Sequence, residues 1–269
     1  MKKLIAILAI PLFIIACSKN SITGRNQLAL FPESTLQAEA VSQYQTFLSQ
    51  SKVVSSTNNK DAEMVKRVGT RIANAITAYY KSKGAAKELD GYNWQFNLVD
   101  NPEINAWCMP GGKVVVYTGL LAVTQNEAAL AIVLGHEITH AVAQHGNERM
   151  SQVALAQGLE VAGNIFTQNN SKANNIFNSV FAPGAQALVL LPNSRNQEYE
   201  ADHYGLIFAA MAGYNPQEAI PFWNRMSKAS EGGNKPPEFL STHPSDENRI
   251  AQLEKFMPEA LKYYKPIKK

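Results

Sequence analysis

Cysteine is scarce in this 269-residue sequence, which contains only two. Cys17 ends an apolar N-terminal segment, and we expect it to be modified there. Cys108 would then have no partner, which excludes an intrachain disulfide even in an oxidising compartment. No histidine pattern that would activate a catalytic thiol accompanies Cys108, so we interpret it as a small buried hydrophobic residue.

A strong excess of charge of either sign is also lacking. The chain has 25 lysines and arginines against 22 aspartates and glutamates, a formal net charge of +3. Lys2 and Lys3 lie in a segment that we expect to be removed, which leaves the mature chain near +1. A charge this small gives no reason to expect a nucleic-acid partner.

The N-terminus has the organisation of a secretory signal. Lys2 and Lys3 precede an apolar stretch, Leu4 to Ala16, that is too short to span a membrane comfortably as a permanent helix. Ile14-Ile15-Ala16-Cys17 resembles a bacterial lipobox, whose cysteine is lipidated and becomes the first mature residue. An ordinary signal peptide with a coincidental cysteine and an uncleaved anchor are the alternatives.

We favour the lipoprotein because the cysteine directly follows a small residue at the end of the apolar stretch. Residues 1–17 are then a signal peptide with its lipobox, and the polar residues 18–30 are a tether. A lipid on Cys17 would anchor the chain to a membrane facing the periplasm of a bacterial cell envelope. Ser18, rather than an aspartate, favours the outer membrane.

Hydrophobic periodicity predicts a mostly helical α+β fold with one domain after the tether, over residues 31–269. Apolar residues recur at helical spacing, or in buried runs, in residues 37–48, 61–80, 128–157, 195–211 and 216–229, and from Ser245 or Asp246 onward. Strands are predicted over residues 92–99, 104–109 and 114–117. Thr124 to Glu127 has the spacing of a capping box for the third helix. We expect short helices or a flap in residues 158–186, and an extended segment in 187–191.

The central motif is His136-Glu137-Ile138-Thr139-His140, inside the apolar run Ala128 to Val142. Two histidines four residues apart lie on one helix face, so both imidazoles can reach a single ion. Glu137 is close enough to act on a water at that ion. This is the H-E-x-x-H arrangement, in which two histidines bind zinc and the glutamate is the general base. The chain has only 5 histidines, which makes a chance match improbable.

A catalytic zinc needs a third protein ligand and an open position for water. One class of zinc peptidase takes a histidine six residues after the second one, but Gly146 stands there and excludes that class. His145 is about half a turn off the ligand face, and we interpret it as a surface residue or as a neighbour of the ligands. Another class takes a glutamate from a later helix, where Glu198 and Asp202 share one face. Glu198 would bind zinc, and Asp202 would accept a hydrogen bond from a ligand histidine.

Two alternatives for this acidic segment remain open. Glu198 and Asp202 could be a solvated acidic face of a surface helix. Glu200 could be the ligand in place of Glu198, although it points elsewhere if Asp202 faces the site. The motif upstream favours Glu198, because it supplies the ligand that the two histidines lack.

The chain resembles peptidase family forty-eight of the metallopeptidases, a gluzincin family that contains the HtpX, CAAX prenyl and Oma-type proteases. The resemblance rests on segments in the family's order over most of the mature chain: Asn105-Ala106-Trp107, Pro110-Gly111-Gly112-Lys113, Gly119-Leu120-Leu121, His136 to His140, Ser194-Arg195, Glu198 to Asp202, Thr242-His243-Pro244 and Arg249. It implies one Zn²⁺ ion held by His136, His140 and Glu198, with Glu137 as the base. It also implies a substrate cleft near the strand 114–117, in a bacterial lipoprotein member with only the peptidase domain.

His243 and Arg249 have the chemistry to stabilise an oxyanion. They could equally be a structural His-Pro turn and an arginine that pairs with a carboxylate, and His243 could instead reach zinc in a resting state. We expect an endopeptidase that cleaves unfolded envelope proteins for quality control. The alternatives are a zinc-stabilised chaperone or assembly lipoprotein without proteolysis, and a tethering lipoprotein without metal.

Overall fold

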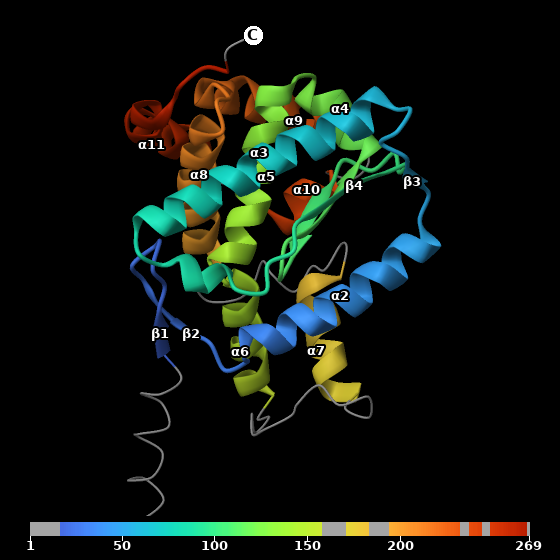
Figure 1. Ribbon diagram of the computed structural model, residues 1–269, viewed down its shortest axis with the longest axis vertical. Helices are drawn as coiled ribbons and strands as arrows, with labels where there is room; N and C mark the ends of the chain where they lie inside the picture. Colours follow the sequence, from blue (N-terminus) through green and yellow to red (C-terminus); the bar gives the residue numbers. More distant parts are fainter. Residues whose placement is uncertain (1–16, 158–170, 183–193, 232–236, 244–247, 268–269) are drawn as a thin grey trace, which may run out of the picture.

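The computed structural model describes residues 17–157, 171–182, 194–231, 237–243 and 248–267 (Figure 1). The architecture is α+β and mostly helical, as the sequence predicts. The strands are β1 (Cys17–Lys19), β2 (Asn26–Leu28), β3 (Val53–Val54), β4 (Gln95–Val99), β5 (Ala106–Met109) and β6 (Lys113–Tyr117). The α-helices are α2 (Glu33–Gln50), α3 (Lys60–Ser82), α4 (Thr118–Thr124), α5 (Glu127–Val142), α6 (His145–Ala156), α7 (Ser171–Phe181), α8 (Ser194–Met211), α9 (Ala219–Glu231), α10 (Glu238–Thr242) and α11 (Arg249–Tyr263). Two 3₁₀ turns, η1 (Ala86–Leu89) and η3 (Pro216–Glu218), connect them.

The main sheet has the order β3-β4-β6-β5, so β5 is an edge strand. β4 and β6 are parallel, and the other two pairs are antiparallel. Strand alternation sorts the side chains: Val114 and Val116 pack in the core that contains α3 and α5, whereas Val115 and Tyr117 pack in the core that contains α2. Figure 1 shows α2 and α3 on opposite sides of the sheet. Among the described residues no strand pairs with the outer edge of β5, and an edge strand of this kind can accept another extended chain.

The helices α5 and α8 pack against each other over much of their length (Figure 1). Two glycines permit this contact. A Cβ atom on Gly135 would lie 2.6 Å from the carbonyl oxygen of Gly205, and one on Gly205 would lie 2.8 Å from the backbone nitrogen of His136. The close approach places the acidic face of α8 beside the two histidines of α5.

Residues 18–30 differ from the predicted tether, because they form a folded hairpin against the body of the protein. β1 and β2 pair antiparallel. Asn20 Nδ2 and Gln27 Nε2 donate to the carbonyl of Ala143 at 3.0 and 3.1 Å, and the backbone N–H of Leu30 donates to Ser151 Oγ at 2.9 Å. The polar side chains that suggested a solvated tether therefore satisfy backbone groups of other elements.

The predicted helix 128–157 is two helices, and its predicted continuity is wrong. α5 ends at Val142, Gln144 adopts the left-handed conformation with φ 56°, and α6 begins at His145. Tyrosine hydroxyl groups from other elements donate hydrogen bonds to the last carbonyls of α5. Tyr92 donates to the carbonyl of Ala141, and Tyr80 donates to that of Val142. These donors satisfy carbonyls that a continuous helix would need for its own ladder.

The start of α5 also differs from the prediction. The cap is Asn126, whose side chain accepts from the N–H of Ala129 at 2.8 Å. Thr124 is instead the last residue of α4, a helix that the sequence analysis missed.

Toward the C-terminus, α7 is one of the predicted short helices, while residues 158–170 and the predicted extended segment 187–191 lie outside the described residues. α11 begins at Arg249, and Ser245 and Asp246 also lie outside the described residues. No described helix has both the length and the apolar character needed to cross a membrane.

Candidate metal centre

α5 carries the first part of the site. His136, Glu137 and His140 are all buried, with at most 7% of any of them exposed. The Nε2 atoms of the two histidines are 3.1 Å apart, as their spacing on one helix face predicts. Two imidazole nitrogens at this separation repel each other unless a proton or a cation lies between them.

α8 brings two carboxylates to the same point. Oε2 of Glu198 lies 3.4 Å from Nε2 of His136, and Oε1 lies 3.3 Å from Nε2 of His140. Oδ1 of Asp202 lies 2.9 Å from Nδ1 of His136, on the outer side of that ring. Both carboxylates are buried, which contradicts the alternative of a solvated acidic face.

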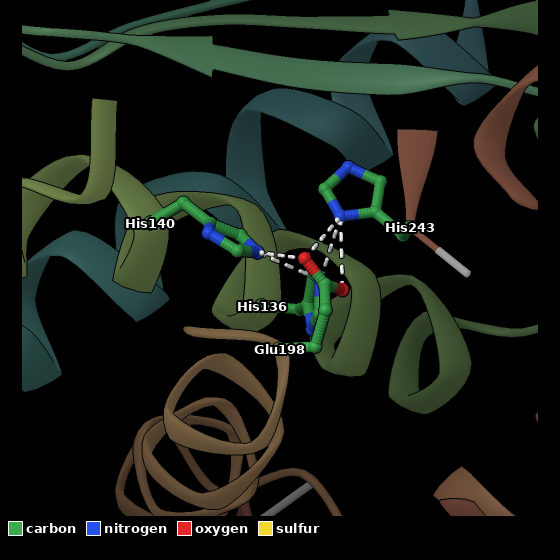
Figure 2. A group of neighbouring side chains, drawn as sticks. All are labelled: His136, His140, Glu198 and His243. Atoms are coloured by element: carbon green, nitrogen blue, oxygen red, sulfur yellow. Dashed lines mark hydrogen bonds and ion pairs between the residues drawn. The ribbon is translucent and has the colours of Figure 1, made fainter. Parts of the chain in front are cut away.

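His243 follows α10 and completes the cluster, as Figure 2 shows. Its Nδ1 lies 3.2 Å from Nε2 of His136 and 3.2 Å from Oε2 of Glu198. α10 is held beside the sheet because the N–H of Phe239 donates to the carbonyl of Ile104, just before β5. The chain therefore delivers three histidines and one glutamate from three helical segments.

Most of the separations among these atoms suit a tetrahedral zinc ion, and the four residues have ligand atoms within 4.8 Å of one another. Ligand atoms about 2.0–2.1 Å from zinc are separated by about 3.3 Å along each edge of a tetrahedron. The separations among Nε2 of His136, Nε2 of His140, the carboxylate of Glu198 and Nδ1 of His243 that are given above run from 3.1 to 3.4 Å. Imidazole and carboxylate donors also suit zinc, so these four residues could hold the ion.

The outer side of His136 is held by a carboxylate and an arginine. Arg249 Nη2 donates to Oδ1 of Asp202 at 2.7 Å, and the guanidinium stacks 3.5 Å from the ring centre of Trp223. Burial alone would lower the pKa of His136, but Asp202 and Glu198 raise it to about 9. Burial would raise the pKa of Asp202, but Arg249 and His136 lower it below its ordinary value.

The outer side of His140 faces a second imidazole. Its Nδ1 lies 2.9 Å from Nδ1 of His145 and 2.8 Å from Nη2 of Arg149. His145 is fully buried, so it is a neighbour of the candidate ligands and not a surface residue. Nε2 of His145 lies 2.9 Å from Oε2 of Glu200, whose carboxylate points away from the cluster and contradicts the competing ligand assignment.

Glu137 lies beside the cluster without belonging to it. Its Oε1 is buried, is 3.3 Å from Nε2 of His243 and has no hydrogen-bond partner among the described residues. Burial raises the pKa of this carboxyl, although His243 and His136 oppose the shift. A carboxyl with these properties can take a proton from water and return it.

A cavity opens beside this group between β5, α5 and α7, and its walls include Trp107, Met109, Glu137, His140, Phe181 and His243. The family resemblance implies a substrate cleft near the strand over 114–117. That strand is β6, which is buried inside the sheet, and the strand that lines the cavity is its neighbour β5. Cys108 also lines the cavity, and burial raises its pKa well above the ordinary value. Its thiol therefore stays protonated and is no nucleophile.

Comparison with known proteins agrees with this geometry. The model of peptidase family M48 matches residues 59–257. The chain is 34% identical over 196 residues to mitochondrial metalloendopeptidase OMA1 of Saccharomyces cerevisiae, covering 70% of this chain and 54% of that protein. It is 33% identical over 249 residues to mitochondrial metalloendopeptidase OMA1 of Bos taurus, with 90% and 46% covered. It is 33% identical over 162 residues to the beta-barrel assembly-enhancing protease of Yersinia pestis, with 59% and 33% covered. The chain thus spans about half, or less, of the length of these relatives.

Proposed function

The chain belongs to peptidase family M48, and from this premise we propose that it is a zinc-dependent endopeptidase. The observation that carries the proposal is the convergence of His136, His140 and Glu198 on one point, with Glu137 beside it, whose Oε1 accepts no hydrogen bond among the described residues. Two imidazoles and a carboxylate are the usual protein ligands of a catalytic zinc in peptidases.

We assign the proton transfers to Glu137. A bound zinc ion would polarise a water and lower its pKa to about 7. Glu137 takes a proton from the attacking water and returns it to the leaving amine of the cleaved peptide bond. Burial raises the pKa of Glu137 above its ordinary value, which makes the carboxylate a stronger base.

His243 has two possible roles, and its position separates them. Its Nδ1 lies 3.2 Å from Nε2 of His136 and 3.2 Å from Oε2 of Glu198, where it would take the position that an attacking water needs if zinc were bound. We therefore assign this arrangement to a resting state, in which His243 has to turn away before the oxyanion can form. Replacement His243→Ala should raise peptide hydrolysis if His243 blocks the site, and should lower it at least 10-fold if it is an oxyanion donor. Initial rates at saturating zinc measure the difference.

Arg249 belongs to the support of the site in this proposal, and not to the oxyanion. Its guanidinium is buried, bonds Asp202 and stacks on Trp223. The placement supports the alternative of a carboxylate-paired arginine, which keeps Asp202 ionised as the acceptor for His136.

Extended polypeptides are the proposed substrates. A peptide can add to the outer edge of β5, which pairs with no other described strand and lines the cavity next to Glu137. Binding of this kind relies on main-chain hydrogen bonds, so it suits unfolded proteins and gives little sequence selectivity. We propose that the targets are misfolded proteins of the bacterial envelope, reached from a lipid anchor on Cys17 with the outer membrane favoured. Cys17→Ala should release the protein from the membrane fraction.

The test uses full-length protein loaded with zinc and unfolded casein. Wild type should cleave it, and Glu137→Gln should bind zinc equally but lose about 10²–10⁴-fold in rate. In cells, N-terminal proteomics of envelope fractions should find new protein N-termini in wild type that Glu137→Gln lacks. Zinc-loaded wild type that cuts no unfolded protein would sink the proposal. The alternative of a zinc-stabilised chaperone, which the filled fourth corner favours, predicts client binding that Glu137→Gln retains.

A further inference from the structure

Arg25 connects the N-terminal hairpin with the helices that surround the metal centre. Its Nη1 and Nη2 donate to the two carboxylate oxygens of Glu148, each at 2.7 Å. Its Nε and Nη2 donate to Glu200 at 2.8 and 3.1 Å. Glu148 lies on α6 and Glu200 on α8, so one guanidinium holds three elements together.

The proton on His140 can go to only one neighbour. With zinc at Nε2 of His140, the neutral ring would carry its proton on Nδ1. Arg149 Nη2, at 2.8 Å, has donors only and cannot accept this proton, so Nδ1 of His145, at 2.9 Å, is the acceptor in the zinc-bound form. His145 then presents a lone pair at Nδ1 and donates from Nε2 to Oε2 of Glu200 at 2.9 Å. Zinc binding and these contacts together assign one tautomer to each ring.

The two ligand histidines have matching supports. His136 bonds Asp202, which is held by Arg249. His140 bonds His145, then Glu200, which is held by Arg25. Each support ends on an arginine, one from α11 and the other from the hairpin. In the second support an extra imidazole spans the distance to the carboxylate.

We propose that Arg25, Glu200 and His145 are positioning residues that orient His140 toward the metal, and that docking of the hairpin is coupled to metal binding. The inference rests on the proposed zinc site but not on proteolysis. Without Arg25, Glu148 and Glu200 lose the guanidinium that neutralises and holds them. Glu200 can then turn away from His145. Because coupling is reciprocal, zinc must also favour the docked hairpin.

The experiment measures zinc affinity of the full chain by competition with a chromogenic chelator. We expect Arg25→Met to bind zinc about 10-fold more weakly, and His145→Phe up to about 100-fold more weakly. Arg25→Lys should restore part of the loss, because it keeps the charge but not the forked geometry. A variant with both Arg25→Met and His145→Phe should bind zinc no more weakly than His145→Phe alone, because Arg25 acts through His145.

Arg225→Met is the matched control. The Arg225 side chain is 24% exposed, against 19% for Arg25, and it pairs with Glu218 away from the cluster. Its zinc affinity should equal that of wild type. In limited proteolysis, zinc should protect the hairpin of wild type and of Arg225→Met, but not that of Arg25→Met.

The possible results test the coupling and the proposed peptidase separately. Wild-type zinc affinity and an unchanged cobalt(II) absorption spectrum in Arg25→Met would overturn the coupling. Wild type that binds zinc but cuts no protein would sink the proposed peptidase and leave this inference to be judged by zinc affinity. Wild type that binds no zinc would overturn both.

Discussion

At the scale of single residues, burial of an acidic side chain outside the cluster leads to a test by pH. Glu33 opens α2, and burial raises its pKa to about 7 despite a hydrogen bond from Asn147. The folded state therefore holds a proton that the unfolded chain releases near pH 4.5. This contribution to stability is full below about pH 4.5 and is lost as the pH rises to about 7.

Glu33→Gln should remove this pH dependence, because an amide does not titrate. Between about pH 5 and about pH 8, wild type should lose up to about 3 kcal/mol more unfolding free energy than the variant. Urea denaturation of the metal-free chain at both pH values measures it, with Glu39→Gln, on the same helix, as the control. Parallel pH curves for wild type and Glu33→Gln would contradict the burial argument.

Helix periodicity could identify only the residues that share one helix face, and His243 and Arg249 came from the family resemblance. His136 and His140 are four apart, as are Glu198 and Asp202, so helix geometry alone brings each pair together. Arg25 and Glu148 are 123 positions apart, and no periodicity connects them. The Arg25 support was therefore missed, although Asp202 was predicted to accept a hydrogen bond from a histidine of the cluster.

At the scale of elements, the crossing of α5 and α8 decides whether Glu198 can reach the two histidines. Gly135→Ala improves intrinsic helix propensity by about 1 kcal/mol. It also drives a methyl group against the backbone of Gly205, which can yield only if the helices separate. Overpacking of this kind costs about 1–3 kcal/mol, so we expect a net loss of stability and weaker zinc binding.

Thermal unfolding and chelator competition test this crossing. Gly205→Ala should act in the same way, and the double variant should cost less than the sum, because both substitutions separate the same two helices. Unchanged zinc affinity in both single variants would show that the close crossing is not needed for the site.

Elements with strong local patterns were predicted well. α3 has helical periodicity, and β4, β5 and β6 coincide with the three predicted strands, whereas β3 was not predicted. The break after α5 and the hairpin were not predicted, because both depend on donors from distant side chains such as Tyr80, Asn20 and Gln27. The assignment of residues 31–269 to one catalytic domain stays a prediction.

At the scale of the whole molecule, the proposed ion would join α5, α8 and the end of α10. At a free zinc concentration of about 1,000 times its Kd, the bound ion should raise the free energy of unfolding by about 4 kcal/mol. A chelator should remove this contribution. Calorimetry with zinc and with chelator should show a large fall in Tm for wild type. His140→Ala, which lacks a ligand, should give the same Tm in both conditions.

The order of the site along the chain has a consequence for biosynthesis. Arg25 precedes the helices that carry the proposed ligands, whereas Arg249 follows them. A ribosome must therefore translate the chain from Arg25 to Arg249 before both supports of the centre can assemble. If the chain is the proposed peptidase, this order delays a fully supported active site until that whole stretch has been made.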